Sequence, residues 1–426
     1  MSDQGLFEFL SVAIALLAGC WLLAFVVRGL KRNREGFALS LPIATAFAVR
    51  LLAAIGLGQL EISRNLRGGD ELTFLARADE VSFLSLGGPE SLDMLISELH
   101  TFLFSVHIRA LDVSPPPDLM LRIEMIVFSV IGIALISAAI WELAGAGAAR
   151  LAAWIMALEP ANIFFSSLLH KEPLMYLAEG MVVFGGAVLW KRGKVIALLP
   201  IIAGCLIAMA TRPYVGWFLT ASAAAVVLHA SLTRQRGLQS LALTALCVVG
   251  IAALVPVVLE KSSDENLKML QSSQDFAASD GANLSLERVD YSTRKNLIVN
   301  LPERISDVIL RPYIWQMQNA SQQLGALGTL VVLACLVLLA MAIVRNRRGI
   351  MRMAGPLVYP AAFMLVAYAI SAGNAGTAYR YRTHLVGLAV GLVIVLLAQR
   401  RQEQEETTRA PARPGLGRVN RTRTAT

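Results

Sequence analysis

The stretch LMLRIEMIVFSVIGIALISAAIW, residues 119–141, decides the fold of this chain. It is almost entirely apolar, and its length matches the roughly 20 residues that an α-helix needs to cross a bilayer. Comparable apolar runs lie near residues 6–30, 37–59, 148–168, 173–190, 195–211, 214–232, 238–259, 324–344, 353–371 and 383–399. We therefore predict an all-α, polytopic transmembrane helix bundle of about 11 spans.

The overall composition excludes a soluble enzyme. Of the 426 residues, 56% are hydrophobic and 16% are charged, and the mean hydropathy is +0.60, whereas a soluble domain carries about 25% charged residues. The net charge of +8 would suggest nucleic acid as a partner only in a soluble protein, so we expect none here. The four cysteines lie in apolar runs without CxxC spacing, which indicates neither a zinc site nor a disulfide framework: Cys20, Cys205, Cys247 and Cys335.

Lysines and arginines gather in alternate loops, as the positive-inside rule requires of the cytoplasmic face. These clusters lie at residues 28–34, 150, 191–194, 234–236, 345–352 and from 400 onward. They and their loops hold 21 Lys and Arg against five acids, whereas the rest of the chain holds 17 against 25. The asymmetry predicts an outside N-terminus and a cytoplasmic C-terminus, which an odd number of spans fits. The first run is too long for a cleavable signal peptide, and no positive charge precedes it.

The chain divides into a transmembrane domain, residues 1–399, and a basic cytoplasmic tail, residues 400–426, which we expect to be disordered because it is polar and lacks periodicity. Two outer loops, residues 60–118 and 260–323, are far longer than a connector needs, and long loops tend to carry function. Within the first, residues 91–111 (SLDMLISELHTFLFSVHIRAL) have apolar positions at helical spacing. They predict either a helix in the membrane interface or an ordinary packing helix.

The acidic stretch RGGDELTFLARADE, residues 67–80, holds our candidate catalytic residues, Asp70 and Glu71. The two preceding glycines permit a sharp turn at the membrane surface. A carboxylate there can act as the general base for a sugar hydroxyl or help to bind a divalent metal, so a metal at Asp70 stays open. The alternative is a solvated loop with Asp70 as a helix N-cap.

The candidate substrate-binding residues stand at the outer ends of the other apolar runs, where an ionisable group is costly and therefore suggests function. Arginines are uncommon on this face, and they bind phosphate oxygens in a bidentate manner. The interfacial aromatic belt would explain the tyrosines and tryptophans, but not the arginines. For Lys171 and Glu172, the alternative is that their side chains reach from the membrane interface into water. The candidates are His170, Lys171, Glu172, Arg212, Arg311, Tyr313, Trp315, Arg380, Arg382 and His384.

Four stretches resemble polytopic bacterial membrane enzymes of cell-surface polysaccharide synthesis, namely lipid-linked-sugar (GT-C type) glycosyltransferases and O-antigen or exopolysaccharide polymerases. These stretches are GGDELTFLARADE, PANIFFSSLLHKE, LPERISDVILRPYIWQ and SAGNAGTAYRYRTHLVGLAVG. The resemblance implies that Asp70 is the base or a metal-associated acid. It also implies that Arg212, Arg311, Arg380 and Arg382 hold a lipid phosphate. The chain departs from the family pattern because its acidic loop follows the second apolar run rather than the first.

Together these features predict a glycosyltransferase or polymerase that acts on polyprenyl-phosphate-linked glycans at the outer face of the bacterial inner membrane. Its partners would be the bilayer, the lipid-linked glycan and other polysaccharide-assembly proteins. Two alternatives remain: a flippase for a lipid-linked oligosaccharide and a non-enzymatic scaffold of an envelope-assembly complex. The sequence has no detectable repeat of the transporter kind, but Arg50 within the second apolar run keeps the flippase open.

Overall fold

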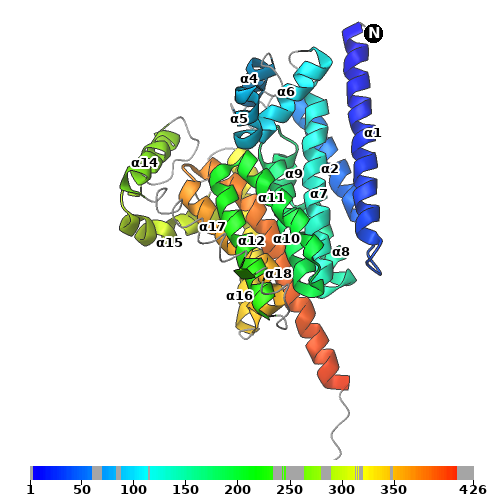
Figure 1. The fold of residues 1–426 in the computed structure, drawn as a ribbon, viewed down its shortest axis with the longest axis vertical. Coiled ribbons are helices and arrows are strands. Elements are labelled where there is room, and N and C mark those ends of the chain that lie inside the picture. The colour runs from blue at the N-terminus through cyan, green and yellow to red at the C-terminus, as the bar shows by residue number, and fades with distance from the viewer. Residues whose placement is uncertain are drawn as a thin grey trace, which may run out of the picture.

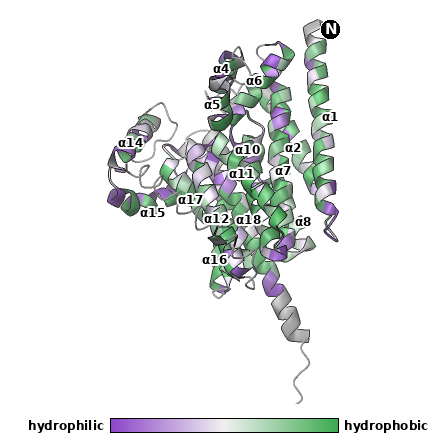
Figure 2. Ribbon diagram, viewed as in Figure 1, coloured by the Kyte–Doolittle hydropathy of each residue, from purple (hydrophilic) through white to green (hydrophobic). Residues whose placement is uncertain are grey.

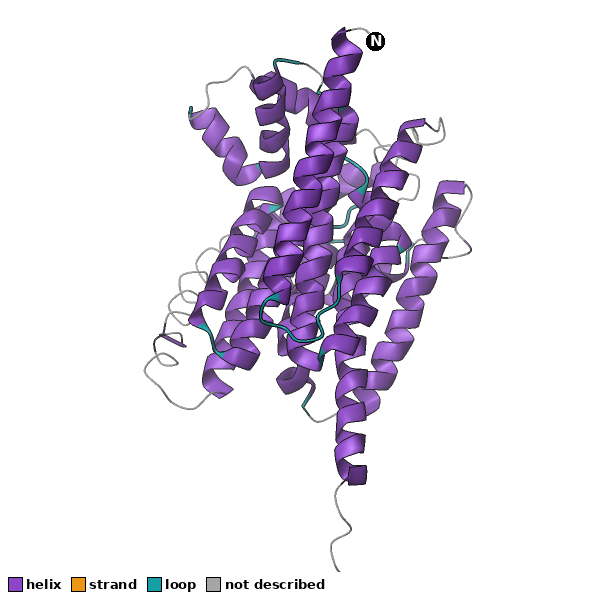
Figure 3. Ribbon diagram, turned by 90° about the vertical axis from the view of Figure 1, so that its right-hand side faces the viewer, coloured by secondary structure: helices purple, strands orange, loops and turns teal. Residues whose placement is uncertain are grey.

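The computed structural model describes residues 3–59, 70–82, 88–113, 116–233, 242, 244–245, 263–279, 289–311, 313, 315, 320–345 and 349–409. These residues form helices joined by short loops and contain no strand (Figure 3). The predicted all-α class is therefore confirmed.

The helices pack as a bundle with smaller helices at its periphery (Figure 1). The bundle helices are α1 (Asp3–Lys31), α2 (Ser40–Gln59), α7 (Asp118–Ala144), α8 (Ala146–Leu158), α9 (Pro160–Ser166), α10 (Glu172–Arg192), α11 (Leu198–Thr211), α12 (Pro213–Thr233), α16 (Ala320–Arg345), α17 (Ile350–Ser371) and α18 (Ala375–Arg409). The smaller ones are α4 (Asp70–Ser82), α5 (Pro89–Ser97), α6 (Leu99–Leu111), η1 (Val195–Ala197), α14 (Asp264–Ser279) and α15 (Arg294–Leu310).

Among the described residues, eight helices are long and apolar enough to cross a membrane: α1, α2, α7, α10, α12, α16, α17 and α18. Two further apolar units, α8 and residues 195–211, are shorter. The protein is thus a multi-pass membrane protein by the length and hydropathy of its helices, and the apolar bundle stands out from its polar ends in Figure 2. Of the predicted runs, the one near 238–259 lies outside the described residues except for residues 242, 244 and 245.

The run predicted near 148–168 is two helices rather than one. α8 ends at Leu158, and Pro160 begins α9, because proline cannot donate the backbone hydrogen bond that would continue a helix. The Glu159 carboxylate accepts hydrogen bonds from the backbone N–H groups of Ala161 and Asn162. It therefore caps the start of α9 inside the bundle.

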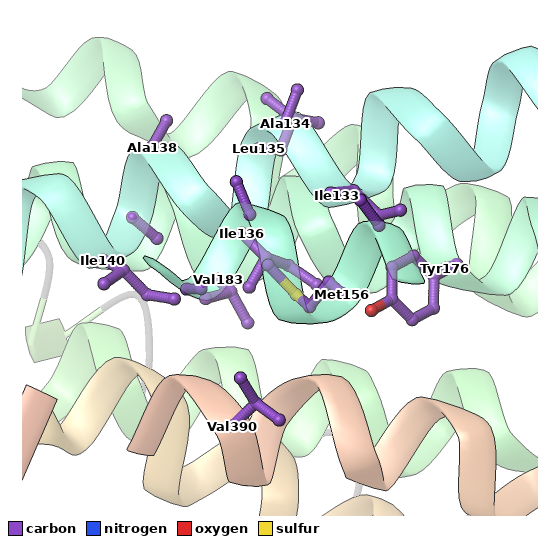
Figure 4. Close-up of a cluster of buried hydrophobic side chains, with 14 of the residues drawn as sticks. Ile133, Ala134, Leu135, Ile136, Ala138, Ile140, Met156, Tyr176, Val183 and Val390 are labelled. Carbon is purple, nitrogen blue, oxygen red and sulfur yellow. The ribbon is translucent and has the colours of Figure 1, made fainter. Parts of the chain in front are cut away.

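Glycines let α7 and α10 pack against each other at the centre of the bundle. A Cβ atom on Gly132 would lie 2.6 Å from the carbonyl oxygen of Tyr176, and one on Gly180 would lie 2.8 Å from that of Gly132. Small residues at such crossings allow close backbone approach, which is how helices associate in lipid. Ile136, Val183 and Val390 belong to the buried apolar cluster that joins this pair to α18 (Figure 4).

Loops that the charge pattern assigns to one side lie together at one end of the bundle. Glu142 accepts hydrogen bonds from Arg34 at 2.6 Å and from Arg192 at 2.7 Å, so the loop after α1 and the ends of α7 and α10 are joined. At the opposite end, ion pairs link α4 to α7 and α10 to the turn after α11. The grouping of the loops follows the predicted alternation, while which end faces the cytoplasm stays a prediction.

The segment predicted as one helix over residues 91–111 consists of α5 and α6, which meet at Glu98. α6 buries His100, Phe104 and Ile108, so it is a packing helix. α5 instead leaves Ile96 exposed, as an interfacial helix would. The second long loop, residues 260–323, contains α14 and α15, and Gln274 of α14 donates a hydrogen bond to the carbonyl oxygen of Ile370 in α17.

α18 continues through Arg409, well beyond the bundle (Figure 1). The first ten residues of the predicted disordered tail therefore extend this helix. The stretch RQEQEETT has charged and amide side chains that favour helix formation in water. Residues 410–426 lie outside the described residues.

Candidate functional site

The loop between α9 and α10, residues 167–171, is held in place by a buried ion pair. Glu71 of α4 accepts hydrogen bonds from Arg122 Nη2 at 2.8 Å and from the backbone N–H of Leu169 at 2.7 Å. Arg122 also donates to the carbonyl oxygen of Ser167 and to Asp118. Both carboxylate oxygens of Glu71 are thus engaged in fixing the loop, a structural role that the sequence did not suggest.

A polar cavity of about 210 Å³ lies beside this loop, at the end of the bundle that carries α4. It lies between α4, the start of α10, the turn from α11 to α12 and the first turns of α18. The loop that Glu71 fixes contributes two of its lining residues. The lining consists of Phe74, His170, Lys171, Glu172, Thr211, Arg212, Pro213, Tyr214, Arg380 and Tyr381.

An ion pair forms one wall of the cavity. Arg212 Nη2 donates to Glu172 Oε1 at 2.6 Å, and both side chains are buried. The guanidinium also lies over the Tyr381 ring at 4.7 Å, and the Tyr381 hydroxyl is 2.7 Å from that of Tyr214. Burial lowers the pKa of Arg212, but the facing carboxylate more than offsets this and the net pKa is raised. Arg212 therefore stays charged in the cavity wall.

The cavity is electropositive. Lys171, Arg212 and Arg380 bring three cations to it, and Glu172 is the one carboxylate among its lining residues. The Lys171 ammonium lies 5.4 Å from the Phe74 ring. Arg212 Nη1 has no hydrogen-bond partner among the described residues. Such an arrangement suits an anion with several oxygens, such as a phosphate.

His100 lies behind Phe74 and adds no charge to the cavity. Its ring is fully buried and meets the Phe74 ring edge-on at 4.4 Å. Burial, with smaller effects of Lys171 and Arg212, holds the pKa of His100 well below its usual value. The imidazole is therefore neutral at physiological pH.

Three predicted substrate-binding residues lie elsewhere. Arg311 Nε is 2.7 Å from Asp307 of α15, so its charge is paired within its own segment. Tyr313 stacks on Trp315 with ring centres 4.8 Å apart, and Trp315 is 81% exposed. The structure does not bring this group into the polar cavity.

Arg382 and His384 also lie outside the polar cavity, although they follow Arg380 in α18. Arg382 is buried and donates from Nη1 to the carbonyl oxygens of Ile309 and Arg311, both at 3.1 Å. His384 is fully buried, with Nδ1 3.3 Å from Glu179 Oε1. A sequence cannot distinguish an arginine that binds helix-end carbonyls from one that lines a cavity. Of the four arginines that we expected to lie together at one site, only Arg212 and Arg380 line the polar cavity.

Asp70 is the first residue of α4, and its side chain is outside what the structure describes. Its proposed role as a base or metal ligand therefore stays a prediction. Within the described residues, no group of three or more His, Cys, Asp or Glu side chains could hold a metal ion. Arg77 and Glu80, further along α4, form an exposed ion pair.

Sequence reasoning missed a buried carboxylate in the bundle interior. Glu179 lies two helical turns beyond Glu172 in α10, fully buried between His384 and the Tyr368 hydroxyl. The signal was present, because an acid inside an apolar run needs a partner. The aromatic lining of the cavity, Phe74, Tyr214 and Tyr381, was also not among the predicted site residues.

Arg50 stood out in the sequence as a charged residue within an apolar run, and the structure provides several hydrogen-bond acceptors for it. Arg50 donates to Asn162 Oδ1 at 2.5 Å and to the carbonyl oxygens of Met156 and Ala157. These last two carbonyls belong to the end of α8, so Arg50 caps the broken helix from inside the bundle.

The cationic cavity is the feature of the described residues that most directly points to a ligand. A comparison with protein-family models, with curated proteins and with solved structures finds none that matches the chain.

Proposed function

We propose that the protein is a glycosyltransferase or polymerase of the bacterial inner membrane. It acts at the outer face on polyprenyl-phosphate-linked sugars in the synthesis of a cell-surface polysaccharide of the exopolysaccharide or O-antigen kind. The observation that carries this proposal is the polar cavity with Lys171, Arg212 and Arg380 at the ends of membrane-crossing helices.

The cavity chemistry fits a lipid-linked sugar donor. In such a donor the phosphate is the leaving group, and cations that face it stabilise the charge that develops when the sugar is transferred. Arg212 and Arg380 suit phosphate oxygens, and the Phe74 ring offers an apolar surface to a sugar. A site at the ends of the helices also lets the lipid chain stay in the bilayer while its head group enters the cavity.

The acceptor hydroxyl needs a base, and Asp70 is the residue we propose. Glu71 is less suited because Arg122 and the backbone of Leu169 already engage its two oxygens. Asp70 precedes Phe74 by four residues in α4, the helix that contributes Phe74 to the cavity. Whether a divalent metal assists Asp70 is part of the same proposal.

The proposal is tested in a deletion strain complemented with variants. Asp70→Asn and Arg380→Gln should each abolish surface glycan while the membrane content of the protein stays unchanged. Arg401→Gln, an exposed cation at the far end of α18, is the matched control and should leave the glycan unchanged. Normal glycan from both Asp70→Asn and Arg380→Gln contradicts the proposal.

Lipid-linked intermediates from the deletion strain separate the two activities. A polymerase defect leaves complete single repeats on the lipid at the outer face. A transferase defect leaves a truncated repeat. Glycan of normal repeat structure and length in the deletion strain contradicts both.

A flippase is the second candidate, because the bundle contains a broken helix, α8–α9, and a buried arginine, Arg50, within α2. Interrupted helices inside the membrane are common in transporters. A flippase defect would trap complete lipid-linked repeats at the cytoplasmic face, out of reach of an added outer-face glycosidase. A scaffold would lose assembly of other proteins without the loss of any enzymatic step.

A further inference from the structure

A second cavity, of about 110 Å³, lies on a different side of α18 from the polar one. Its lining is apolar apart from a single arginine, Arg382. We call it the lipid-side slot. α16 supplies Val332, Leu336 and Leu339, α17 supplies Ala361, and α18 supplies Ala389 and Leu392.

The slot follows the axis of α18. Arg382 and Leu392 both line it, and ten residues of α-helix span about 15 Å. Beside it, α16 presents exposed apolar side chains such as Val337 and Val344. A helix with such a surface faces lipid in a membrane protein, so the slot lies next to the bilayer rather than in the bundle centre.

Arg382 carries a buried charge that the protein leaves only partly satisfied. Nη1 donates to the carbonyl oxygens of Ile309 and Arg311, but Nη2 has no hydrogen-bond partner among the described residues. No described carboxylate forms a salt bridge with it, in contrast to Arg212, which pairs with Glu172. The guanidinium also lies over the Tyr379 ring, 4.7 Å from the ring centre. A buried guanidinium without a salt-bridge partner at the end of an apolar slot suits an anion attached to an apolar chain.

The slot is separate from the polar cavity. Arg380 lines the polar cavity, whereas Arg382 lines the slot. Two residues along an α-helix turn by about 200°, so these two side chains point about 160° apart. The first turns of α18 therefore divide two cationic sites that a sequence motif would place together.

We propose that the lipid-side slot binds one molecule of an anionic bilayer phospholipid. An acyl chain lies along α18 between α16 and α17, and the phosphate accepts a hydrogen bond from Arg382 Nη2. The phospholipid supplies an anionic partner within hydrogen-bond distance of Arg382, which no described carboxylate does, and it reaches the slot from the surrounding bilayer. This inference does not depend on the proposed transferase activity.

The test is native mass spectrometry of the full-length, delipidated protein in detergent, with phosphatidylglycerol as the probe. We expect one tightly bound molecule on the wild type, and weaker binding of zwitterionic phosphatidylethanolamine. Ala389→Phe fills the slot while leaving Arg382 and its hydrogen bonds in place. It should weaken phosphatidylglycerol binding by about tenfold or more, as should Arg382→Gln, since a charge-assisted hydrogen bond is lost.

Arg401→Gln removes an exposed charge from the same helix and should bind phosphatidylglycerol like the wild type. Ala361→Leu narrows the slot from α17 and serves if Ala389→Phe does not fold. Equal phosphatidylglycerol binding by the wild type and the slot-filled variant overturns the proposal. So does a slot that binds polyprenyl phosphate but not phosphatidylglycerol, because it would then belong to the substrate.

Discussion

Replacement of Glu71 separates a structural role of this carboxylate from a chemical one. Glu71 ties α4 to α7 through Arg122 and to the loop after α9 through the Leu169 N–H. Glu71→Ala removes both contacts, whereas Glu71→Gln keeps an acceptor for the Leu169 N–H and loses only the charge. A structural role tolerates the glutamine, and a general base does not.

The size of the effect follows from burial. Arg122 and Glu71 are 1% and 6% exposed at their side chains, and breaking a buried pair by removing one partner costs about 3–5 kcal/mol. Arg122 keeps Asp118 and the Ser167 carbonyl oxygen, which favours the lower end of that range, although the Leu169 N–H loses its acceptor. We expect Glu71→Ala to lower the free energy of unfolding by about 3–4 kcal/mol, and Glu71→Gln by about 1–2 kcal/mol.

The assay combines unfolding in mixed micelles, followed by tryptophan fluorescence, with the amount of surface glycan per folded protein. Under the structural role, glycan per folded protein is unchanged in Glu71→Gln. A glutamine variant that is as stable as the wild type but makes no glycan refutes the structural reasoning. It would return Glu71 to the catalytic residues beside Asp70.

Three further outcomes follow from the buried groups. In a double-mutant cycle of Glu172→Gln and Arg212→Gln, each single variant should lose about 3 kcal/mol of unfolding free energy, and the double variant should lose less than their sum; additive losses would show that the pair is not coupled. Because the pKa of folded His100 lies well below its usual value near 6.5, the unfolded chain binds a proton that the folded chain does not. The free energy of unfolding should therefore fall as the pH drops below about 6.5, and His100→Asn should weaken this dependence on pH. The same pH dependence in the variant and the wild type would contradict the assignment to His100. Gly132→Ala should cost about 1–3 kcal/mol, because its Cβ meets the backbone of α10; Gly147→Ala, where a Cβ meets nothing within 4 Å, is the control in the same unfolding assay.

The helices could be predicted from the sequence because hydropathy over about 20 residues is a local property. The same reasoning failed around residue 159, where it predicted one helix in place of two. An average over apolar residues does not detect that Pro160 ends one helix and starts another. The contact of Arg34, Glu142 and Arg192, at the end of the bundle that carries the basic loops, shows what charge counting can predict. It groups loops on one side, but it does not predict which of them pair.

The candidate site was predictable in part for the same reason. Lys171, Glu172, Arg212 and Arg380 stood out as charges at helix ends, and they line one cavity. Arg382 stood out equally, yet its position two residues along α18 turns it to another side. The direction of a side chain depends on which helices pack around it, and that is tertiary information.

Arg50 bears on the choice between an enzyme and a transporter. In a transporter, the two ends of a broken helix leave backbone groups and dipoles free to hold the substrate. Here the protein itself occupies both ends. Arg50 binds the terminal carbonyls of α8, and the Glu159 carboxylate binds the first N–H groups of α9. With neither end available to a ligand, the break is a fixed structural element. The polar cavity near Arg212 and Arg380 then remains the better candidate for substrate, which favours the enzyme.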